Sequence, residues 1–149
     1  MNTSPSSESR VNVALVGCGG IARSQHLPNL TRTPGVRLQA VCDVHRSAAE
    51  SAARDYGVPR VTEHVADLLA DPAIELVVVA TKEDFQVSLT CQALAAGKHV
   101  WSEKPFALDL ESGQALLDEA HRVGLRVACA PHTVLGARGR CPQGQTGAQ

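Results

Sequence analysis

The residues with the clearest chemical potential form a glycine turn near the amino terminus. The segment VNVALVGCGGIA (residues 11–22) is typical of a buried strand, a Gly-x-Gly-x-x-Ala turn and the start of a helix. Gly17 permits a tight turn, and Gly19 lets the backbone approach a pyrophosphate because it carries no side chain. Ala22 allows the helix to pack closely on a sheet. This spacing predicts a turn that binds the phosphates of a dinucleotide.

Two further features extend this predicted site. The backbone amides of Gly20 and Ile21 would lie at a helix amino terminus, where unpaired N–H groups and a partial positive charge attract anions. Asp43 follows the next strand, where its carboxylate can accept hydrogen bonds from the adenosine ribose, although a helix-capping role is the alternative. An acid here repels a 2′-phosphate and favours NAD, while His45 and Arg46 nearby keep NADP open.

Strands and helices that alternate through short connections would position these residues. Strands are expected at residues 11–16, 36–43, 60–61, 74–80, 98–102 and 125–130. Helices are expected at residues 20–32, 46–56, 63–70, 85–96 and 110–123. Six strands joined by crossover helices predict a single-domain α/β fold with a doubly wound parallel sheet, the Rossmann fold that binds NAD(P).

Local signals refine the helices. Pro28 should kink or shorten the first helix, and Thr62, Asp84 and Asp109 are predicted to cap later ones. Apolar residues at helical spacing are expected to face the core. They are Phe85, Leu89, Ala93 and Ala96 in one helix and Leu110, Leu117, Ala120 and Val123 in another.

Composition excludes several classes of protein. The 149 residues fit one domain, and a net charge of −1 without a basic stripe argues against nucleic-acid binding. The polar amino terminus is not a signal peptide, and the longest apolar run, residues 76–80, is too short to cross a bilayer. The five cysteines are scattered without a Cys-x-x-Cys pair. We therefore expect a cytoplasmic protein with reduced thiols, no metal site and no membrane partner.

The two ends of the chain have a different character from the alternating segment. Residues 1–10 are serine-rich and are expected to be disordered. Residues 136–149 contain four glycines, three glutamines and no large apolar side chain. The sequence thus predicts an NAD(P)-binding domain over residues 11–131 and a disordered or truncated tail over residues 132–149.

A second group of residues allows a family to be suggested. HVWSEKP (99–105), together with GCGGIA, the His26-Leu27-Pro28 step, Asp43 and ALAAGKH (93–99), resembles the Gfo/Idh/MocA family of NAD(P)-dependent oxidoreductases. The resemblance covers about residues 11–135. A methyltransferase would share the glycine turn and the acid, but not the residues that follow the fifth strand.

The resemblance implies roles for the Glu-Lys-Pro triplet at the nicotinamide end of the cofactor. Lys104 would contact the substrate hydroxyl and the nicotinamide ribose as the catalytic residue, and a cationic donor there stabilises a developing alkoxide. Glu103 would help to fix the ribose and Lys104, and Pro105 would set the loop through a cis peptide bond. The alternative for Lys104 is a surface lysine before a turn.

The loop after the fourth strand departs from the family pattern. The family usually has Thr or Ser, then Pro, with an Asn and a His nearby; this chain has ATKEDFQ (80–86). Thr81 is retained and is expected along the cofactor. Lys82, Glu83 and Gln86 replace the other three residues, and we interpret Lys82 and Glu83 as a solvated pair.

The function implied is NAD(P) binding within an oxidoreductase that transfers hydride to or from a hydroxyl of a sugar, inositol or similar alcohol. The family's second domain, which supplies the substrate pocket, has no counterpart in the sequence, so we hypothesise a truncated or frameshifted product. A substrate would bind only if that domain were supplied. The alternatives are a non-catalytic dinucleotide-binding module and an inactive remnant, and exposed apolar surface would favour a homo-oligomer.

Overall fold

Six parallel strands form the centre of the molecule in residues 10–129, the part of the chain that the computed structural model describes. They are β1 (Val11–Val16), β2 (Val36–Cys42), β3 (Arg60–Thr62), β4 (Leu76–Val79), β5 (His99–Ser102) and β6 (Val127–Cys129). Their order across the sheet is β3-β2-β1-β4-β5-β6, the order of a doubly wound dinucleotide-binding sheet. The predicted α/β Rossmann fold is therefore confirmed.

The segments expected to be disordered or truncated, residues 1–10 and 132–149, lie outside the described residues except for Arg10. The same is true of Cys141. The predicted domain boundaries at residues 11 and 131 stay a prediction.

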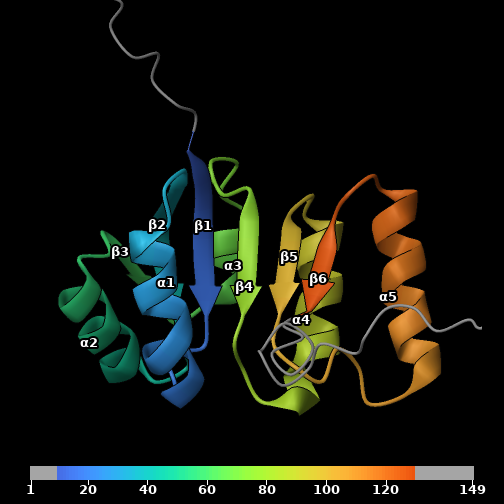
Figure 1. Ribbon diagram of the computed structural model, residues 1–149, viewed down its shortest axis with the longest axis horizontal. Helices are drawn as coiled ribbons and strands as arrows, with labels where there is room; N and C mark the ends of the chain where they lie inside the picture. The colour runs from blue at the N-terminus through green and yellow to red at the C-terminus, as the bar shows by residue number, and fades with distance from the viewer. Residues whose placement is uncertain (1–9, 130–149) are drawn as a thin grey trace, which may run out of the picture.

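Helices cover the sheet on both faces (Figure 1). They are η1 (Ala22–His26), α1 (Leu27–Arg32), α2 (Arg46–Tyr56), α3 (Val65–Leu69), α4 (Glu83–Ala95) and α5 (Leu110–Arg122). One core lies between the sheet and the helices α1 and α2, and the other between the sheet and α3, α4 and α5. Each connection therefore places its helix on one face before the chain returns to a parallel strand.

The strand β1 shows how one segment serves both cores. Val13 and Leu15 pack on the side of α1 and α2, whereas Ala14 and Val16 pack on the opposite side. Successive side chains of a strand point to opposite faces, so a strand buried on both faces needs a continuous apolar run. This requirement explains why β1 and β4 are almost purely aliphatic.

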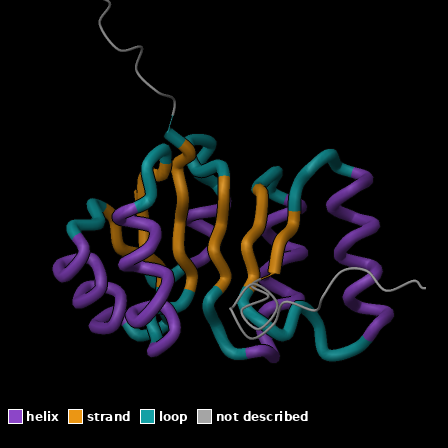
Figure 2. The backbone as a smooth tube through the Cα atoms, in the orientation of Figure 1, coloured by secondary structure: helices purple, strands orange, loops and turns teal. Residues whose placement is uncertain are grey.

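One part of the sheet is not covered in the described region. The helices α1 and α2 lie in front of β1, β2 and β3, and no helix lies in front of β5 and β6 (Figure 2). Trp101 of β5 and its register partner Ala128 of β6 are both exposed there. The sheet thus presents a partly apolar face that these residues leave open.

The first helix is irregular next to its proline, as predicted. Helical structure begins at Gly20, and η1 is a π turn that ends at His26, with the Leu27 amide donating to the Ala22 carbonyl. Pro28 has no amide hydrogen, and its ring crowds the carbonyl of Ser24 four residues earlier. The wider turn accommodates that ring, so the helix is deformed before Pro28 and continues to Arg32.

Two predicted helix caps are wrong and one is confirmed. The side chain of Asp109 accepts a hydrogen bond from the Ser112 amide at 2.7 Å and caps α5. Asp84 lies inside the first turn of α4, because the helix begins two residues earlier than predicted. Thr62 does not cap α3, which begins only at Val65; its hydroxyl accepts a bond from the His64 amide.

The buried faces of α4 and α5 also differ from the prediction. Buried residues of α4 are Gln86, Thr90, Ala93 and Leu94, whereas Phe85 is 58% exposed. In α5 the buried residues are Leu116 and Ala120, whereas Leu110 is 87% exposed. Ala93 and Ala120 are buried as predicted, so the prediction is confirmed for these two residues and wrong for Phe85, Leu110 and Leu117.

Candidate dinucleotide site

The predicted site residues meet at one edge of the sheet. Because every strand pair is parallel, the carboxyl ends of β1, β2, β4 and β5 lie at the same edge. The chain order reverses between β1 and β4, which makes this the switch point where open α/β sheets bind ligands. The residues predicted from the sequence follow these strand ends: Gly17, Gly19, Gly20, Ile21, Asp43, Thr81, Glu103, Lys104 and Pro105.

Gly17 is required by the protein itself. Its φ of +95° is a left-handed conformation that side chains disfavour. A Cβ at this position would also lie 2.8 Å from the carbonyl carbon of Ala80, at the end of β4. The Gly17 amide donates to the carbonyl of Cys42 at 2.8 Å. The turn therefore packs tightly between the ends of the two strands that flank β1.

Gly19 and Gly20 have no such internal reason to be glycines. Neither has a positive φ, both are exposed, and a Cβ on either would meet no described atom within 4 Å. The open space lies over the start of the helix, where the amides of Gly20 and Ile21 have no partner within the helix. A bare backbone at this place fits a phosphate that approaches from outside.

Asp43 lies directly beside the glycine turn. Its Oδ2 accepts a hydrogen bond from the Cys18 amide at 2.8 Å, and its Oδ1 accepts one from the His45 amide at 2.9 Å. The side chain does not cap α2, which begins after His45 without a side-chain bond. Each carboxylate oxygen keeps a lone pair for a ribose hydroxyl, and the residue is half-buried.

The thiols near the turn are not reactive groups. Burial, and next the charge of Asp43, raise the pKa of Cys18 from 9.0 to about 12, and the same causes raise the pKa of Cys42 to about 11. Both side chains are therefore neutral at pH 7. Among the described cysteines Cys18 and Cys42 are buried, and Cys91 is exposed.

The loop after β4 is held by a residue that the sequence analysis did not place. Gln86 is buried; its Nε2 donates to the Thr81 carbonyl at 3.2 Å, and its Oε1 accepts from Ser102 Oγ at 3.4 Å. The Gln86 side chain thereby joins the loop after β4 to the end of β5. Lys82 and Glu83 are exposed, as interpreted, and no ion pair joins them within the described part of the chain.

The Glu-Lys-Pro triplet follows β5. Glu103 is 8% exposed; its amide donates to the Val79 carbonyl at 3.0 Å, and its Oε2 accepts from the Lys104 amide at 3.2 Å. The Lys104–Pro105 peptide bond is cis, as the resemblance implied. The Lys104 side chain is exposed, and its ammonium has no partner among residues 10–129. It is thus available to a ligand at this edge.

His26 is the functional neighbour that sequence reasoning missed. Its Nε2 lies 2.7 Å from Oε1 of Glu103, and both side chains are close to 90% buried, with 12% and 10% exposed. The two residues are 77 positions apart, so spacing gave no signal for the pair. His26 did stand in a segment that carried the family resemblance.

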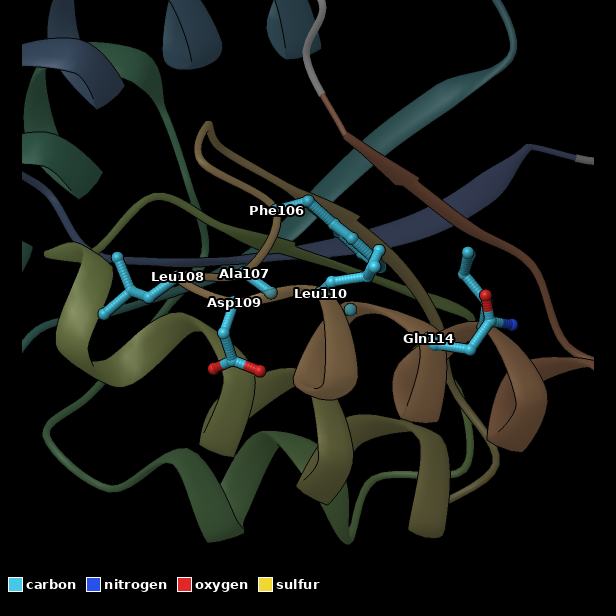
Figure 3. A pocket seen from close by; sticks show the side chains of 8 residues that line it. Phe106, Ala107, Leu108, Asp109, Leu110 and Gln114 are labelled. Carbon is cyan, nitrogen blue, oxygen red and sulfur yellow. The ribbon is translucent and has the colours of Figure 1, made fainter.

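A shallow groove begins just after the triplet (Figure 3). It has a volume of about 450 Å³, and its lining is Phe106, Ala107, Leu108, Asp109, Leu110, Gly113, Gln114 and Leu117. The one ionisable side chain in this set, Asp109, is occupied by the Ser112 cap, which lowers its pKa. The groove is therefore a largely apolar surface whose lining begins two residues after Lys104.

The described residues provide neither a metal centre nor a membrane span. In residues 10–129, no three or more His, Cys, Asp or Glu side chains are grouped so that they could bind a metal ion. Within the same range, no helix has both the length and the hydropathy that a membrane span needs.

Comparison with known proteins gives the family. A family model described as "Oxidoreductase family, NAD-binding Rossmann fold" (GFO_IDH_MocA) matches residues 11–130. The chain therefore belongs to the Gfo/Idh/MocA oxidoreductase family, and it is the NAD-binding Rossmann domain of that family. The resemblance inferred from residues 99–105 and the glycine turn is confirmed.

Individual relatives agree with this assignment. The inositol 2-dehydrogenase/D-chiro-inositol 3-dehydrogenase of Lactiplantibacillus plantarum is 36% identical over 117 residues, which are 77% of this chain and 33% of that protein. The structure of GenD2 from gentamicin A biosynthesis, in complex with NAD, is 32% identical with a TM-score of 0.81, covering 90% of this chain and 38% of GenD2.

A third relative is the 3-ketoreductase KijD10 from Actinomadura kijaniata, solved with NADP and TDP-benzene. It is 25% identical with a TM-score of 0.83, covering 88% of this chain and 40% of KijD10. The chain thus spans between a third and two fifths of the length of these relatives. Solved relatives were crystallised with either NAD or NADP.

Proposed function

We propose that the backbone amides of Gly19, Gly20 and Ile21 bind the pyrophosphate of NAD while Asp43 binds the adenosine ribose. Gly17, whose amide is bonded to the Cys42 carbonyl, shapes the turn that presents them. The observation that carries this proposal is the 2.8 Å bond between the Cys18 amide and Oδ2 of Asp43, which joins the turn to the acid. It sets the carboxylate directly beside the glycine turn. Thr81, at the adjacent strand end, lies along the cofactor in this arrangement.

NAD is preferred over NADP in this proposal. A 2′-phosphate on the ribose would meet the carboxylate of Asp43, and the nearest following cation is already engaged. Arg46 pairs with Glu50 at 2.8 Å and with Glu63 at 3.3 Å. Two carboxylates therefore compete with a phosphate for the same guanidinium, which lowers the affinity for NADP.

At the other end of the cofactor, Lys104 is the proposed catalytic residue. Bound NAD supplies the hydride acceptor, and the chain's own residues orient the alcohol. The Lys104 ammonium would donate a hydrogen bond to the substrate oxygen and stabilise the negative charge that develops there. The base that accepts the hydroxyl proton would come from the substrate domain. Glu103 and Pro105 set the backbone that carries it. The substrate class is a sugar, inositol or similar alcohol, supported by the inositol dehydrogenase relative and requiring a substrate domain.

Calorimetric titration with NAD and with NADP tests the cofactor proposal. We expect NAD to bind more tightly than NADP, and Asp43→Ala to weaken NAD by about 10- to 100-fold, the range for bonds to a charged group. Arg37→Ala, an exposed change at the opposite end of β2, is the control and should leave both affinities unaltered. Equal NAD affinity in Asp43→Ala and the parent chain would contradict the proposal.

Activity is tested separately, with a polyol and sugar panel and NAD reduction followed by absorbance. We expect binding without turnover from this chain alone, because the groove that follows the triplet offers few polar groups to a polyol. Turnover by the chain alone would show that the pocket needs no second domain.

We propose a cytoplasmic location, because Cys18, Cys42 and Cys91 form no disulfide within the described residues, which fits a reducing compartment. We also propose that the chain self-associates through its exposed apolar residues.

A further inference from the structure

The contact between His26 and Glu103 joins two halves of the site that are remote in sequence. His26 ends the π turn of the helix that begins at the phosphate-binding glycines, and Glu103 begins the loop that carries Lys104. Their side chains meet at 2.7 Å in a position where little solvent reaches either one. The contact therefore links the first helix directly to the loop that carries Lys104.

The helix is shaped to deliver this histidine. The helix is anchored at its start, because Tyr56 Oη donates to the Arg23 carbonyl at 3.1 Å and the Arg23 guanidinium pairs with Asp55 at 3.0 Å. The π turn over Ala22–His26 then rotates the residues that follow relative to a regular α-helix. Such turns are frequent at functional sites, and His26 is the last residue of this one.

Both carboxylate oxygens and both backbone polar groups of Glu103 have hydrogen-bond partners once this contact is made. Its amide binds the Val79 carbonyl, its Oε2 accepts the Lys104 amide, and its carbonyl accepts a bond from Cys129 Sγ at 3.5 Å. The remaining carboxylate oxygen, Oε1, is the one that His26 holds. Of the pair Glu103 and Lys104, only the lysine side chain remains free to address a ligand.

We propose that His26 is a positioning residue for the nicotinamide half of the cofactor. By holding Oε1 of Glu103, it fixes the backbone at Lys104 and aims the ammonium at the nicotinamide ribose and the substrate hydroxyl. The proposal rests on the proposed function, since it assumes that NAD occupies the edge of the sheet. It separates two tasks: Asp43 and the glycines hold the adenosine half, and His26 acts only on the other half.

Paired ligands test this separation. NAD and ADP share the adenosine half and the two phosphates, but ADP lacks both the nicotinamide and its ribose. We expect the parent chain to bind NAD more tightly than ADP in calorimetric titration. His26→Ala should lower the NAD affinity about tenfold, as for loss of one buried hydrogen bond to a charged group. The ADP affinity should stay within about twofold of the parent value.

Two variants complete the experiment. His26→Gln retains an N–H donor and should recover part of the NAD affinity, which a loss of packing alone would not predict. His121→Ala, an exposed histidine in the last turn of α5, is the matched control and should change neither ligand.

Three results would overturn the inference, each in a recognisable way. An equal loss of affinity for both ligands in His26→Ala would mean a structural role, and parent affinities for both ligands would mean no role. A parent chain that binds ADP but gains nothing from the nicotinamide half would also refute it, while leaving the adenosine site intact. A parent chain that binds neither ligand would instead refute the proposed function itself.

Discussion

Three glycines follow β1, and they lack a side chain for different reasons. Gly17 is constrained by its backbone conformation and by the carbonyl of Ala80, so glycine is required there by the fold itself. Gly19 and Gly20 face open space, so glycine is required there by a ligand that approaches from outside. One sequence motif therefore combines a folding requirement with a binding requirement.

Substitution separates these two requirements. Gly17→Ala should destabilise the fold by more than about 2 kcal/mol, because it adds a left-handed alanine and a steric clash. Gly19→Ala should leave the free energy of unfolding within about 0.5 kcal/mol of the parent and weaken NAD binding instead. Urea unfolding and calorimetric titration measure the two effects. An unstable Gly19→Ala, or one with full NAD affinity, would show that the open space does not hold the phosphates.

The buried thiols beside Asp43 make the free energy of unfolding depend on pH in the alkaline range. The pKa of Cys18 is raised from 9.0 to about 12, so between these values the unfolded chain loses a proton that the folded chain keeps. The folded state then binds more protons, and the free energy of unfolding falls as pH rises through this window. We expect a loss of up to about 1 kcal/mol per pH unit from this thiol, and none of it below pH 9.

Urea unfolding at pH 8 and pH 10 measures this loss. Cys18→Ala should show a smaller decrease between the two values than the parent chain, whereas Cys91→Ala, at an exposed thiol, should show the parent's decrease. If both variants lost the same stability as the parent, the Cys18 thiol would not be the group responsible.

For single residues, the sequence was informative wherever the role of a residue depends on its neighbours in the chain. The turn and the acid after β2 were predictable because each depends on its neighbours in the chain, whereas the lysine before the cis proline was implied by the family resemblance. The contact of His26 with Glu103 was not predictable, because it depends on the packing of a helix against a loop 77 positions away. Sequence spacing contains no information on such a pair.

The element scale shows a different limit, in the orientation of α4. The sequence pattern placed Phe85 in the core, but the helix buries Gln86 and Thr90 instead. A buried glutamine is acceptable here because its amide bonds to the ends of β4 and β5, which hydropathy cannot register. The existence of α4 was thus predictable from its pattern, but the face it buries was not.

For substitutions on the two faces of α4, the structure predicts the opposite order of destabilisation from the sequence pattern. Gln86→Ala should destabilise the protein by about 2 kcal/mol, since the Thr81 carbonyl and the Ser102 hydroxyl lose a partner in the interior. Phe85→Ala should cost less than about 0.5 kcal/mol, because that ring is largely exposed. Both values follow from urea unfolding. A larger loss from Phe85→Ala than from Gln86→Ala would restore the face that the sequence pattern favoured.

At the scale of the molecule, strand order follows from general rules and surface properties do not. Alternating strands and helices with short connections lead to a parallel sheet, and the order 3-2-1-4-5-6 is the common solution for dinucleotide binding. Which apolar residues remain exposed depends on how each helix is rotated. Leu110 and Leu117, predicted to face the sheet, instead form an outward stripe on α5.

That stripe is the basis of the predicted self-association. Leu110 and Leu117 are two turns apart on one face of α5 and border the groove together with Leu108, and their exposed fractions are 87%, 48% and 63%. Contiguous apolar surface of this kind is unfavourable in water and marks interaction sites.

We expect a dimer whose population increases with concentration in sedimentation equilibrium. Leu110→Glu should shift the dimer to monomer because it places a charge in the interface. Phe85→Glu, at an exposed ring on α4, is the control, and a parent chain that remains monomeric at all concentrations would show that the stripe binds no second copy.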